Sequence, residues 1–589
     1  MANVKVTIND IQVEVPSTAT VLEAATKANV DIPRLCFLKG INENSSCRLC
    51  VVEIQGMRGL KNSCTVQVSD GMVVRTDTEK VLRAVKTNLQ LLAGNHKFEC
   101  WKCPREHNCE LLRLLRKYNI ENRIGEDPTF SKKDQIINVS EALVIDSSKC
   151  VLCGRCIAAC EKLAGTSVLD YNYRGSKTYV GPALNFPIDK AGCIYCGKCI
   201  QACPTGALKE KDGISLAQEY VKNKEYYTVA CIAPAVRSAL GEEFGYHIGE
   251  FNAEKKAYSA LRALGVDDIT DVNFAADVTI MEEGTELIGR LNKHLKGEET
   301  VLPMFTSCSP GWIRFIEIYY PHLLKHLSTT KSPQQIQGAL IKHYYAEKIG
   351  VDKDKIKVIS IMPCSCKKYE ASREEMVTDG LRDIDVVLTT REFARWIKMN
   401  DINFNDLEDY TPTSPLAKYT GASVIFGATG GVMEAALRTV KDVLEKTDNK
   451  QVDITNLRGV DNIKEATLTI DGKELTVAVV HGGAHIKEML KRIEENPNKY
   501  AFVEFMGCTG GCVNGGGQPI VPSYIADNVD VREMRAKILY DIDKETPLRK
   551  SHENPFVIEL YKDFLKEPNS EIAHHLLHTT YFPKGLYER

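Results

Sequence analysis

Cysteine is the residue type in this chain best suited to chemistry, and fifteen of the 21 cysteines lie between Cys36 and Cys203. The first residues, MANVKVTINDIQVEV, alternate polar and apolar side chains and lack the charged and apolar regions of a secretory signal. We therefore expect a cytoplasmic protein, in whose reducing surroundings thiols do not pair as disulfides. The cysteines are then best explained as metal ligands.

Two similar cysteine runs, each spaced C-x2-C-x2-C-x3-C, occupy residues 150–160 and 193–203. In bacterial two-cluster ferredoxins this spacing gives three ligands to one [4Fe-4S] cluster, and the fourth cysteine of each run binds the other cluster. Zinc is the alternative, but a tetrahedral zinc site needs no crossed fourth ligand. The expected ligand sets are Cys150, Cys153, Cys156 and Cys203 for one cluster, and Cys193, Cys196, Cys199 and Cys160 for the other.

A third group, Cys36, Cys47, Cys50 and Cys64, lies in a strand-rich segment and favours a [2Fe-2S] cluster. Its first gap is ten residues, whereas the plant-type spacing has four, so zinc stays an alternative.

A fourth group has the spacing H-x3-C-x2-C-x5-C and comprises His96, Cys100, Cys103 and Cys109. It predicts a third [4Fe-4S] cluster, whose potential a neutral imidazole ligand would raise. The alternative is a surface histidine beside a cluster with three cysteine ligands. His107 is a poorer candidate because it lies inside the cysteine loop.

Several domains are expected to position these groups, because 589 residues exceed what one core usually supports. The fold class is multidomain, α+β and α/β. Strand patterns such as VKVTI and MVVRT, with one helical stretch, predict a small β-grasp-like [2Fe-2S] domain; further along, buried strand patterns such as IKVISIM alternate with helices and predict parallel strands. The predicted domains are residues 1–78 ([2Fe-2S]), 79–125 (His/Cys cluster), 140–209 (two-[4Fe-4S] ferredoxin), 210–525 (large α/β) and 526–589 (helical C-terminal segment).

Composition excludes two classes of partner. The 75 basic and 78 acidic residues leave a net charge of -3 without long runs of either sign, so neither nucleic acid nor an anionic membrane is expected. No apolar stretch approaches the roughly 18 residues of a membrane span.

Three segments of the large domain resemble the signature segments of the H-cluster domain of iron-only ([FeFe]) hydrogenases. They are TSCSPGW (306–312), MPCSCKKYE (362–370) and EFMGCTGGCVNGGGQP (504–519), and blocks such as CIAPAVRSALGE, KSPQQ and RKSHENP extend the resemblance over nearly the whole chain. The front half alone also resembles the cluster-bearing subunit of respiratory NADH dehydrogenase. The resemblance implies an enzyme that interconverts protons, electrons and H2.

The resemblance also implies a cofactor, a [4Fe-4S] cube joined through a cysteine sulfur to a two-iron unit that carries CO, cyanide and an azadithiolate bridge. Cys364, Cys508 and Cys512 match three cube ligands, with Cys512 at the bridging position, and Lys367 matches a lysine that hydrogen-bonds a cyanide. The following residues match pocket-lining positions, although each is also compatible with ordinary core: Pro234, Pro333, Gln334, Met362, Phe426 and Met506.

A proton path is implied by Glu283, Glu286 and Arg290, which at i, i+3 and i+7 share one helical face, together with Ser328. The alternative for such a face is a solvated, salt-bridged helix surface.

The first signature segment departs from the family, which has two adjacent cysteines where this chain has Cys308 and Ser309. The family spacing of 55 residues before Cys364 puts Ser309 at the cube-ligand position and Cys308 at the proton-donor position. Either Cys308 ligates the cube and the donor is lost, or Ser309 ligates as an alkoxide; the softer thiolate favours Cys308. Cys366 and Cys231 are additional thiols that either replace the missing acid, protect the site or fill the core.

The expected partners are ferredoxin or another redox protein, the maturation enzymes, and NAD(P)H-oxidising subunits if the chain belongs to a larger complex. The chain shows no dinucleotide-binding fingerprint of its own. The alternatives to a fast enzyme are an H2 sensor or low-activity H-cluster protein, and a non-catalytic iron-sulfur electron-transfer or assembly protein.

Overall fold

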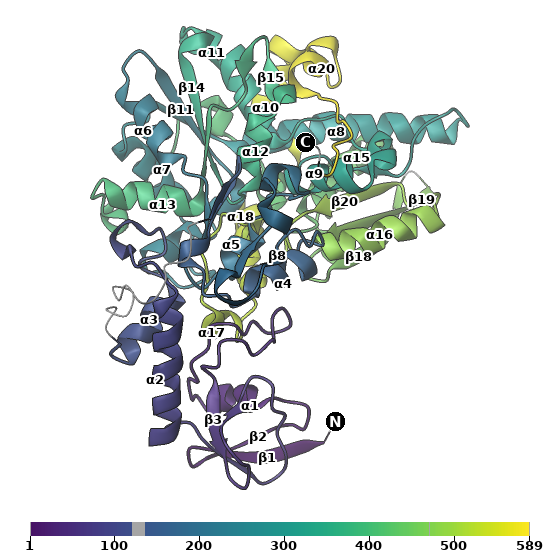
Figure 1. Cartoon of the computed structure of the whole chain (residues 1–589). Coiled ribbons are helices and arrows are strands. Elements are labelled where there is room, and N and C mark those ends of the chain that lie inside the picture. Colours follow the sequence, from purple (N-terminus) through teal and green to yellow (C-terminus); the bar gives the residue numbers. More distant parts are fainter. Residues whose placement is uncertain (1, 121–135, 471, 588–589) are drawn as a thin grey trace.

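The computed structural model describes residues 2–120, 136–470 and 472–587. Figure 1 shows a large body with the N-terminal module at the far end of a stalk that contains the long helix α2 (Glu79–Gly94). The predicted end of the second domain, at residue 125, lies outside the described residues. No helix in the described part of the chain is long and apolar enough to cross a bilayer.

The N-terminal module is a mixed five-stranded sheet, in the order β2-β1-β5-β3-β4, with helix α1 (Val21–Lys27) packed on it. Val6 and Ile8 of β1 point into the core, while Lys5 before them and Thr7 between them are more exposed, which is the alternation of a half-buried strand. The strands are β1 (Asn3–Ile8), β2 (Ile11–Pro16), β3 (Val51–Ile54), β4 (Lys61–Asn62) and β5 (Met72–Arg75).

Helices α2 and α3 (Glu110–Lys117) connect this module to the rest. The buried face of α2 consists of Val81, Val85, Leu89 and Ala93, at the four-residue spacing that places side chains on one side of a helix. These side chains pack in one apolar cluster with residues of both the N-terminal module and the next module.

Residues 136–210 form the ferredoxin-like module, in which two similar loop-helix units follow each other. Each helix starts after a glycine with positive φ, Gly154 before α4 (Arg155–Lys162) and Gly197 before α5 (Lys198–Ala202). The module's strands are β6 (Ile137–Val139), β7 (Leu143–Asp146), β8 (Asp170–Asn172), β9 (Tyr179–Gly181) and β10 (Leu208–Glu210).

The body contains two four-stranded sheets, with orders β12-β11-β14-β17 and β13-β20-β19-β18. All strand pairs are parallel except the β18–β19 hairpin, so the predicted α/β fold with parallel strands is confirmed. The strands are β11 (Tyr227–Ile232), β12 (Asp268–Asp271), β13 (Met304–Phe305), β14 (Ile356–Met362), β17 (Val386–Thr389), β18 (Ile463–Ile470), β19 (Lys473–His481) and β20 (Phe502–Met506); β15 (Val377–Thr378) and β16 (Leu381–Arg382) form a separate hairpin.

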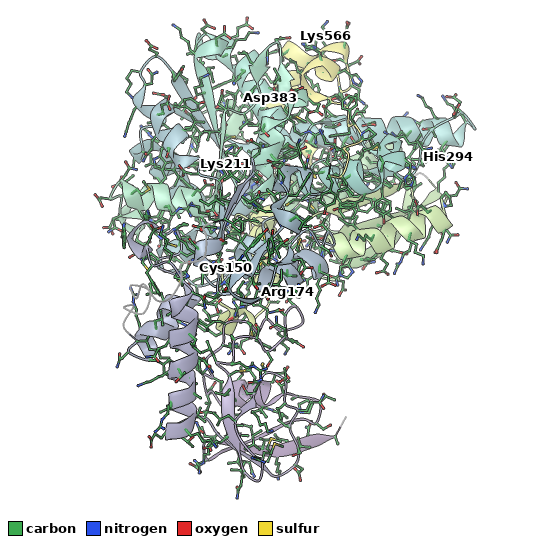
Figure 2. All side chains as sticks on the ribbon, viewed as in Figure 1. Cys150, Arg174, Lys211, His294, Asp383 and Lys566 are labelled. Atoms are coloured by element: carbon green, nitrogen blue, oxygen red, sulfur yellow. The ribbon has the colours of Figure 1, made fainter. Side chains whose placement is uncertain are left out.

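Helices surround these sheets, and α8 (Val272–Leu295) is long enough that its C-terminal end projects from the body, where Figure 2 labels His294. Helices α10 and α15 pack on α8, and the C-terminal helices α19 and α20 cover α8 and α10. The remaining helices are α6 (Ile214–Lys222), α7 (Glu254–Ala263), α9 (Pro310–Tyr319), α10 (Pro333–Leu340), α11 (Ala346–Ile349), α12 (Cys366–Ser372), α13 (Thr390–Met399), α14 (Gly421–Val424), α15 (Gly431–Glu445), α16 (Gly483–Glu495), α17 (Ser523–Ala526), α18 (Val531–Glu545), α19 (Pro555–Leu560) and α20 (Glu571–Leu577).

Candidate functional site

A cavity with an empty volume of about 740 Å³ lies where strands of both body sheets end. Pro234 follows β11, Cys308 follows β13, Cys364 follows β14 and Cys508 follows β20, and all four line this cavity. The carboxyl ends of parallel strands are where open α/β sheets bind their ligands. The two-sheet body therefore brings residues from distant parts of the chain to one enclosed site.

Three thiols from two separate segments, Cys364, Cys508 and Cys512, line the cavity together. Burial raises the pKa of Cys364 and raises that of Cys512 to about 12. A thiol buried in this way becomes a thiolate when a metal ion supplies the positive charge. The donor set therefore fits an iron-sulfur cube, as expected from the signature segments.

Glycines allow the loop that carries Cys508 and Cys512 to approach its neighbours. A Cβ on Gly511, whose φ is +89°, would lie 2.6 Å from the backbone nitrogen of Thr429, and a Cβ on Gly515 would lie 2.2 Å from the Pro363 carbonyl oxygen. Only glycine permits such contacts between backbones. The loop can thus fold tightly around the cavity.

The six residues expected to line a pocket, from Pro234 to Met506, all line this cavity. The two additional thiols are not among its lining residues. Cys231 is fully buried within β11, and Cys366 packs with cysteines of the ferredoxin-like module. Their placement favours a packing role over an acid or protective role at the cavity.

Cys308 and Ser309 have different surroundings. The Ser309 hydroxyl accepts a hydrogen bond of 3.1 Å from the Gly507 amide, next to Cys508. Burial raises the pKa of the Cys308 thiol well above the usual value, and the charges of Glu283 and Glu504 add to the rise.

Lys367 lies in the cavity wall on α12. Its ammonium donates to Glu370 at 2.8 Å, to the Ser332 hydroxyl at 2.7 Å and to the Cys308 carbonyl oxygen at 3.3 Å. Glu370 and Ser332 were not singled out from the sequence, although both lie in blocks that carry the resemblance. Together they fix the ammonium beside the cavity.

Glu283, Glu286 and Arg290 of α8 lie in a row with Ser328, and the row becomes more exposed toward Arg290. The Glu286 carboxylate accepts from the Ser328 hydroxyl at 2.8 Å and pairs with Arg290 at 2.6 Å, and the side chains of Glu286 and Arg290 are each 15% exposed. Glu283, one turn earlier and 1% exposed, has its carboxyl group close to the Ser307 amide and the Ser328 hydroxyl, although neither contact has full hydrogen-bond geometry. Burial, and next the charge of Glu286, raise the pKa of Glu283 to about 8.

The four cysteines of the N-terminal module converge. The Cys50 and Cys64 sulfurs are 3.2 Å apart, and the hydrogen bond from Cys47 lowers the pKa of Cys36 to about 6. Cys36 and Cys47 thus form a second pair beside Cys50 and Cys64, and the four sulfurs make one site.

His96, Cys100, Cys103 and Cys109 line a common cavity with an empty volume of about 280 Å³. The Nδ1 atom of His96 lies 3.0 Å from the Lys149 carbonyl oxygen, so Nδ1 carries the proton and Nε2 is left without a proton and able to bind a metal. Burial lowers the pKa of His96 to about 4, which keeps the imidazole neutral. His107 is not among the residues that line this cavity.

The cysteines of the two runs in the ferredoxin-like module are arranged in crossed sets; Figure 2 labels Cys150, the first of them. A cavity with an empty volume of about 400 Å³ is lined by Cys150, Cys153 and Cys156 of one run and by Cys203 of the other. In the same way, the charge of Cys160 from the first run helps to raise the pKa of Cys193, Cys196 and Cys199 in the second run.

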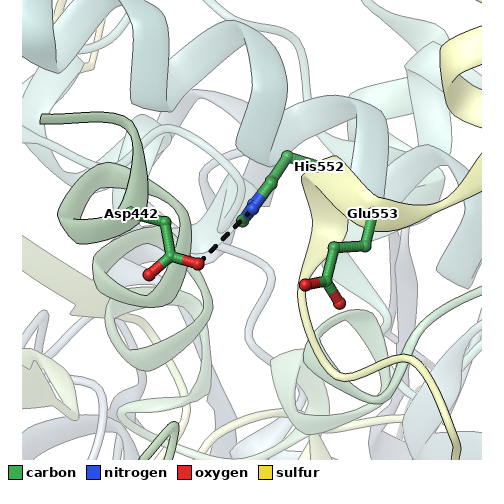
Figure 3. Close-up of side chains that lie close together, drawn as sticks. All are labelled: Asp442, His552 and Glu553. Atoms are coloured by element: carbon green, nitrogen blue, oxygen red, sulfur yellow. Dashed lines mark ion pairs between the residues drawn. The ribbon is translucent and has the colours of Figure 1, made fainter. Parts of the chain in front are cut away.

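A cluster of Asp442, His552 and Glu553 also has potential metal-ligand atoms close together (Figure 3). The Lys550 ammonium bonds Asp442 and lies 2.7 Å from Asp448, so a cation already balances these carboxylates. We interpret this cluster as an ion-pair network that holds residues 550–553 against α15.

Comparison with protein families agrees with this geometry. Residues 226–516 match the family described as "Iron only hydrogenase large subunit, C-terminal domain", and residues 529–584 match "Iron hydrogenase small subunit". The front of the chain matches "2Fe-2S iron-sulfur cluster binding domain" at 1–79, "NADH-ubiquinone oxidoreductase-G iron-sulfur binding region" at 86–123 and "4Fe-4S dicluster domain" at 149–207.

Two full-length relatives and a solved structure are similar to the chain. The NADP-reducing hydrogenase subunit HndD of Solidesulfovibrio fructosivorans is 42% identical, over 99% of this chain and 100% of the relative. Iron hydrogenase 1 of Clostridium pasteurianum is 42% identical, over 98% and 99%. The structure of [FeFe]-hydrogenase HydA1 from Chlamydomonas reinhardtii is similar with a TM-score of 0.57 and 37% sequence identity. The match covers 64% of this chain and 100% of the HydA1 chain. The family expected from the three signature segments is thereby confirmed, and the chain belongs to the iron-only hydrogenases.

Proposed function

We propose that this hydrogenase carries an H-cluster, a [4Fe-4S] cube with an attached two-iron unit bearing CO, cyanide and an azadithiolate bridge, in the cavity at the strand ends. The observation that carries the proposal is that Cys364, Cys508 and Cys512 line one cavity with Lys367. When bound, this group supplies the site at which protons and electrons combine to H2. The protein's residues hold the group, exclude water and deliver protons.

The proton route begins at Cys308. The charge of Glu283 acts on this thiol, and from Glu283 the Ser328 hydroxyl and Glu286 continue toward the partly exposed Arg290. The Ser309 hydroxyl instead lies beside Cys508, where the cube is proposed. These surroundings favour the alternative in which Cys308 keeps the proton-donor role and Ser309 ligates the cube. The softer thiolate favours the reverse assignment.

For the electrons, we propose one [2Fe-2S] and three accessory [4Fe-4S] clusters in the four sites described above. Ferredoxin or another redox protein is the proposed partner. The name of the relative HndD, an NADP-reducing hydrogenase subunit, supports a second candidate, a complex with NAD(P)H-oxidising subunits.

The test is infrared spectroscopy of the chain produced together with the maturation enzymes. We expect CO and cyanide stretching bands, and H2 evolution with reduced ferredoxin; the same chain made without those enzymes should carry cubes but show neither. A matured protein without these bands contradicts the proposed cofactor. Bands accompanied by only slow turnover would favour the H2-sensing alternative.

The partner is tested separately with the matured chain. H2 evolution is measured with reduced ferredoxin and with NADH, each with and without added NADH-oxidising subunits. Activity with ferredoxin alone supports a free-standing enzyme, whereas activity that requires NADH and the added subunits supports a complex.

A further inference from the structure

Lys198 is a buried lysine without a carboxylate partner. It lies between Cys196 and Cys199 and is 3% exposed, and its ammonium donates to the Asn514 carbonyl oxygen at 2.5 Å and to the Gln201 side-chain oxygen at 2.8 Å. Both acceptors are uncharged. Within residues 2–120, 136–470 and 472–587, no carboxylate lies within salt-bridge distance of its Nζ. Three other buried lysines of the body are paired with carboxylates, namely Lys331 with Asp383, Lys367 with Glu370 and Lys368 with Glu392.

The surroundings of Lys198 belong to two different metal sites. Its acceptor Asn514 follows Cys512 in the cavity loop, and Gln201 also donates to the Gly515 carbonyl oxygen at 2.8 Å. The two backbones touch here, since a Cβ on Gly516 would lie 2.1 Å from the Cys196 carbonyl oxygen. Lys198 therefore lies at the junction between the ferredoxin-like module and the cavity.

The charged groups that act on Lys198 also come from both sites. They are the sulfurs of Cys508, Cys196 and Cys364, and the guanidinium of Arg535. The Arg535 charge is already matched by Glu242, at 2.6 Å. The negative charge that faces the Lys198 ammonium is thus that of the cysteine ligands and the clusters they hold.

A buried charge is unfavourable unless an opposite charge compensates it. An iron-sulfur cube bound by thiolates becomes more negative on reduction, and its potential depends on net charge and on nearby hydrogen bonds. A cation between two cubes stabilises the reduced form of each and so raises both reduction potentials.

We propose that Lys198 is a positioning residue for electron transfer, which provides a shared positive charge to the cube of Cys193, Cys196, Cys199 and Cys160 and to the cube of Cys364, Cys508 and Cys512. Its bond to Asn514 holds the two loops in contact, so the electron crosses between cubes whose potentials are adjusted by the same charge. This inference rests on the proposed function, because it requires cubes in both sites.

The experiment uses the full chain produced without maturation enzymes, so that the cubes form and the two-iron unit does not. Electron paramagnetic resonance during a redox titration measures the midpoint potential of each cube. We expect Lys198→Gln to shift these potentials to lower values, and Lys198→Arg to stay close to the unaltered chain. The control is Lys190→Gln, which removes a solvent-exposed charge three residues before Cys193 and should leave the potentials unchanged because water screens it.

A second variant keeps the lysine and cancels its charge. Gln201→Glu places a carboxylate at the oxygen that Lys198 already contacts, and it should lower the potentials in the same direction. This variant decides the matter if Lys198→Gln does not assemble its cubes. If the potentials are unchanged in either variant that carries its clusters, the role proposed for Lys198 is overturned, and the proposed function is not affected. Absence of [4Fe-4S] signals from the unaltered chain overturns the proposed function as well.

Discussion

Glu283 is a buried carboxyl group whose charge acts on Cys308, a residue that lines the cavity. A group that accepts and donates protons in a dry site contributes roughly 10²–10⁴-fold to rate. We expect Glu283→Gln to reduce H2 evolution by about that factor, because an amide cannot relay a proton, while cluster spectra stay unchanged. Turnover with reduced ferredoxin, measured beside the infrared spectrum, checks this.

The matched control is the neighbouring residue Glu282, which is equally buried on α8 but points to the C-terminal segment. Its carboxylate accepts from the Tyr561 hydroxyl at 2.5 Å and lies 3.0 Å from His578. Glu282→Gln should retain most turnover. If both variants lose turnover equally, the loss reports damage to α8, and the relay role of Glu283 is not supported.

The pH dependence follows from the same carboxyl group. The pKa of Glu283 is raised to about 8 by burial, and next by Glu286, so the group is protonated below that pH. H2 evolution draws on the protonated form and should fall as the pH rises through about 8, whereas H2 oxidation needs the ionised form and should fall below it. Rate profiles in both directions measure this, and Glu283→Gln should lack the inflection.

The sequence located the thiols and the carboxylates of the site but not the side chains that support them. Cys364 and Glu283 could be identified because the signature segments and a helical spacing mark them. Glu370 and Lys198 could not, since their roles depend on which side chains of other segments face them. The surroundings of Cys308 and Ser309 also depend on the folded loop, whereas residue chemistry alone favours Cys308 as the cube ligand.

Replacement of a glycine by alanine should have opposite effects on stability in helix α8 and in the cavity loop. Gly289 is an exposed residue inside α8, and a Cβ there would meet nothing within 4 Å. Gly289→Ala should therefore stabilise the protein by about 0.5–1 kcal/mol, because alanine loses less backbone entropy in a helix.

The contrasting change is Gly516→Ala, whose Cβ would collide with the Cys196 carbonyl oxygen at 2.1 Å. It should lower the melting temperature and separate the cavity loop from the ferredoxin-like module. Thermal unfolding of both variants checks the pair of predictions. A Gly516→Ala protein as stable as the unaltered chain would contradict the close contact of the two loops.

Individual elements were more predictable than their arrangement. The buried runs that became β11, β14 and β17 and the amphipathic stretch in α2 follow from local periodicity. The division of the body strands into two sheets does not, because strand pairing depends on contacts between distant segments. The convergence of four strand ends on one cavity was consequently not predicted; the family resemblance implied only that Cys364, Cys508 and Cys512 hold one cube.

At the scale of the whole molecule, one guanidinium joins all four cluster-bearing and catalytic parts. Arg155 of the ferredoxin-like module pairs with Glu110 of α3 at 2.7 Å, donates to the Phe37 carbonyl oxygen of the N-terminal module at 3.1 Å and contacts Ser523 of the body at 3.2 Å. Ser523 in turn donates to Glu110 at 2.9 Å. The stalk visible in Figure 1 is thus attached to the body through a buried ion pair.

Removing one partner of such a pair leaves a buried charge uncompensated, at a cost of about 3–5 kcal/mol, whereas replacing both by apolar residues costs much less. We expect Glu110→Gln to reduce the protection of α3 amides against hydrogen exchange by a free energy of that size, and the Arg155→Met, Glu110→Leu double variant to restore most of it. Amides of β11 and β14, inside the body, are the internal control and should exchange as before. Unchanged α3 protection in Glu110→Gln would contradict this role of the ion pair and show that Arg155 serves only its own loop. The modules would then be held together by apolar contacts, in the cluster that contains Leu111 and Leu114 of α3 and Val85 and Leu89 of α2.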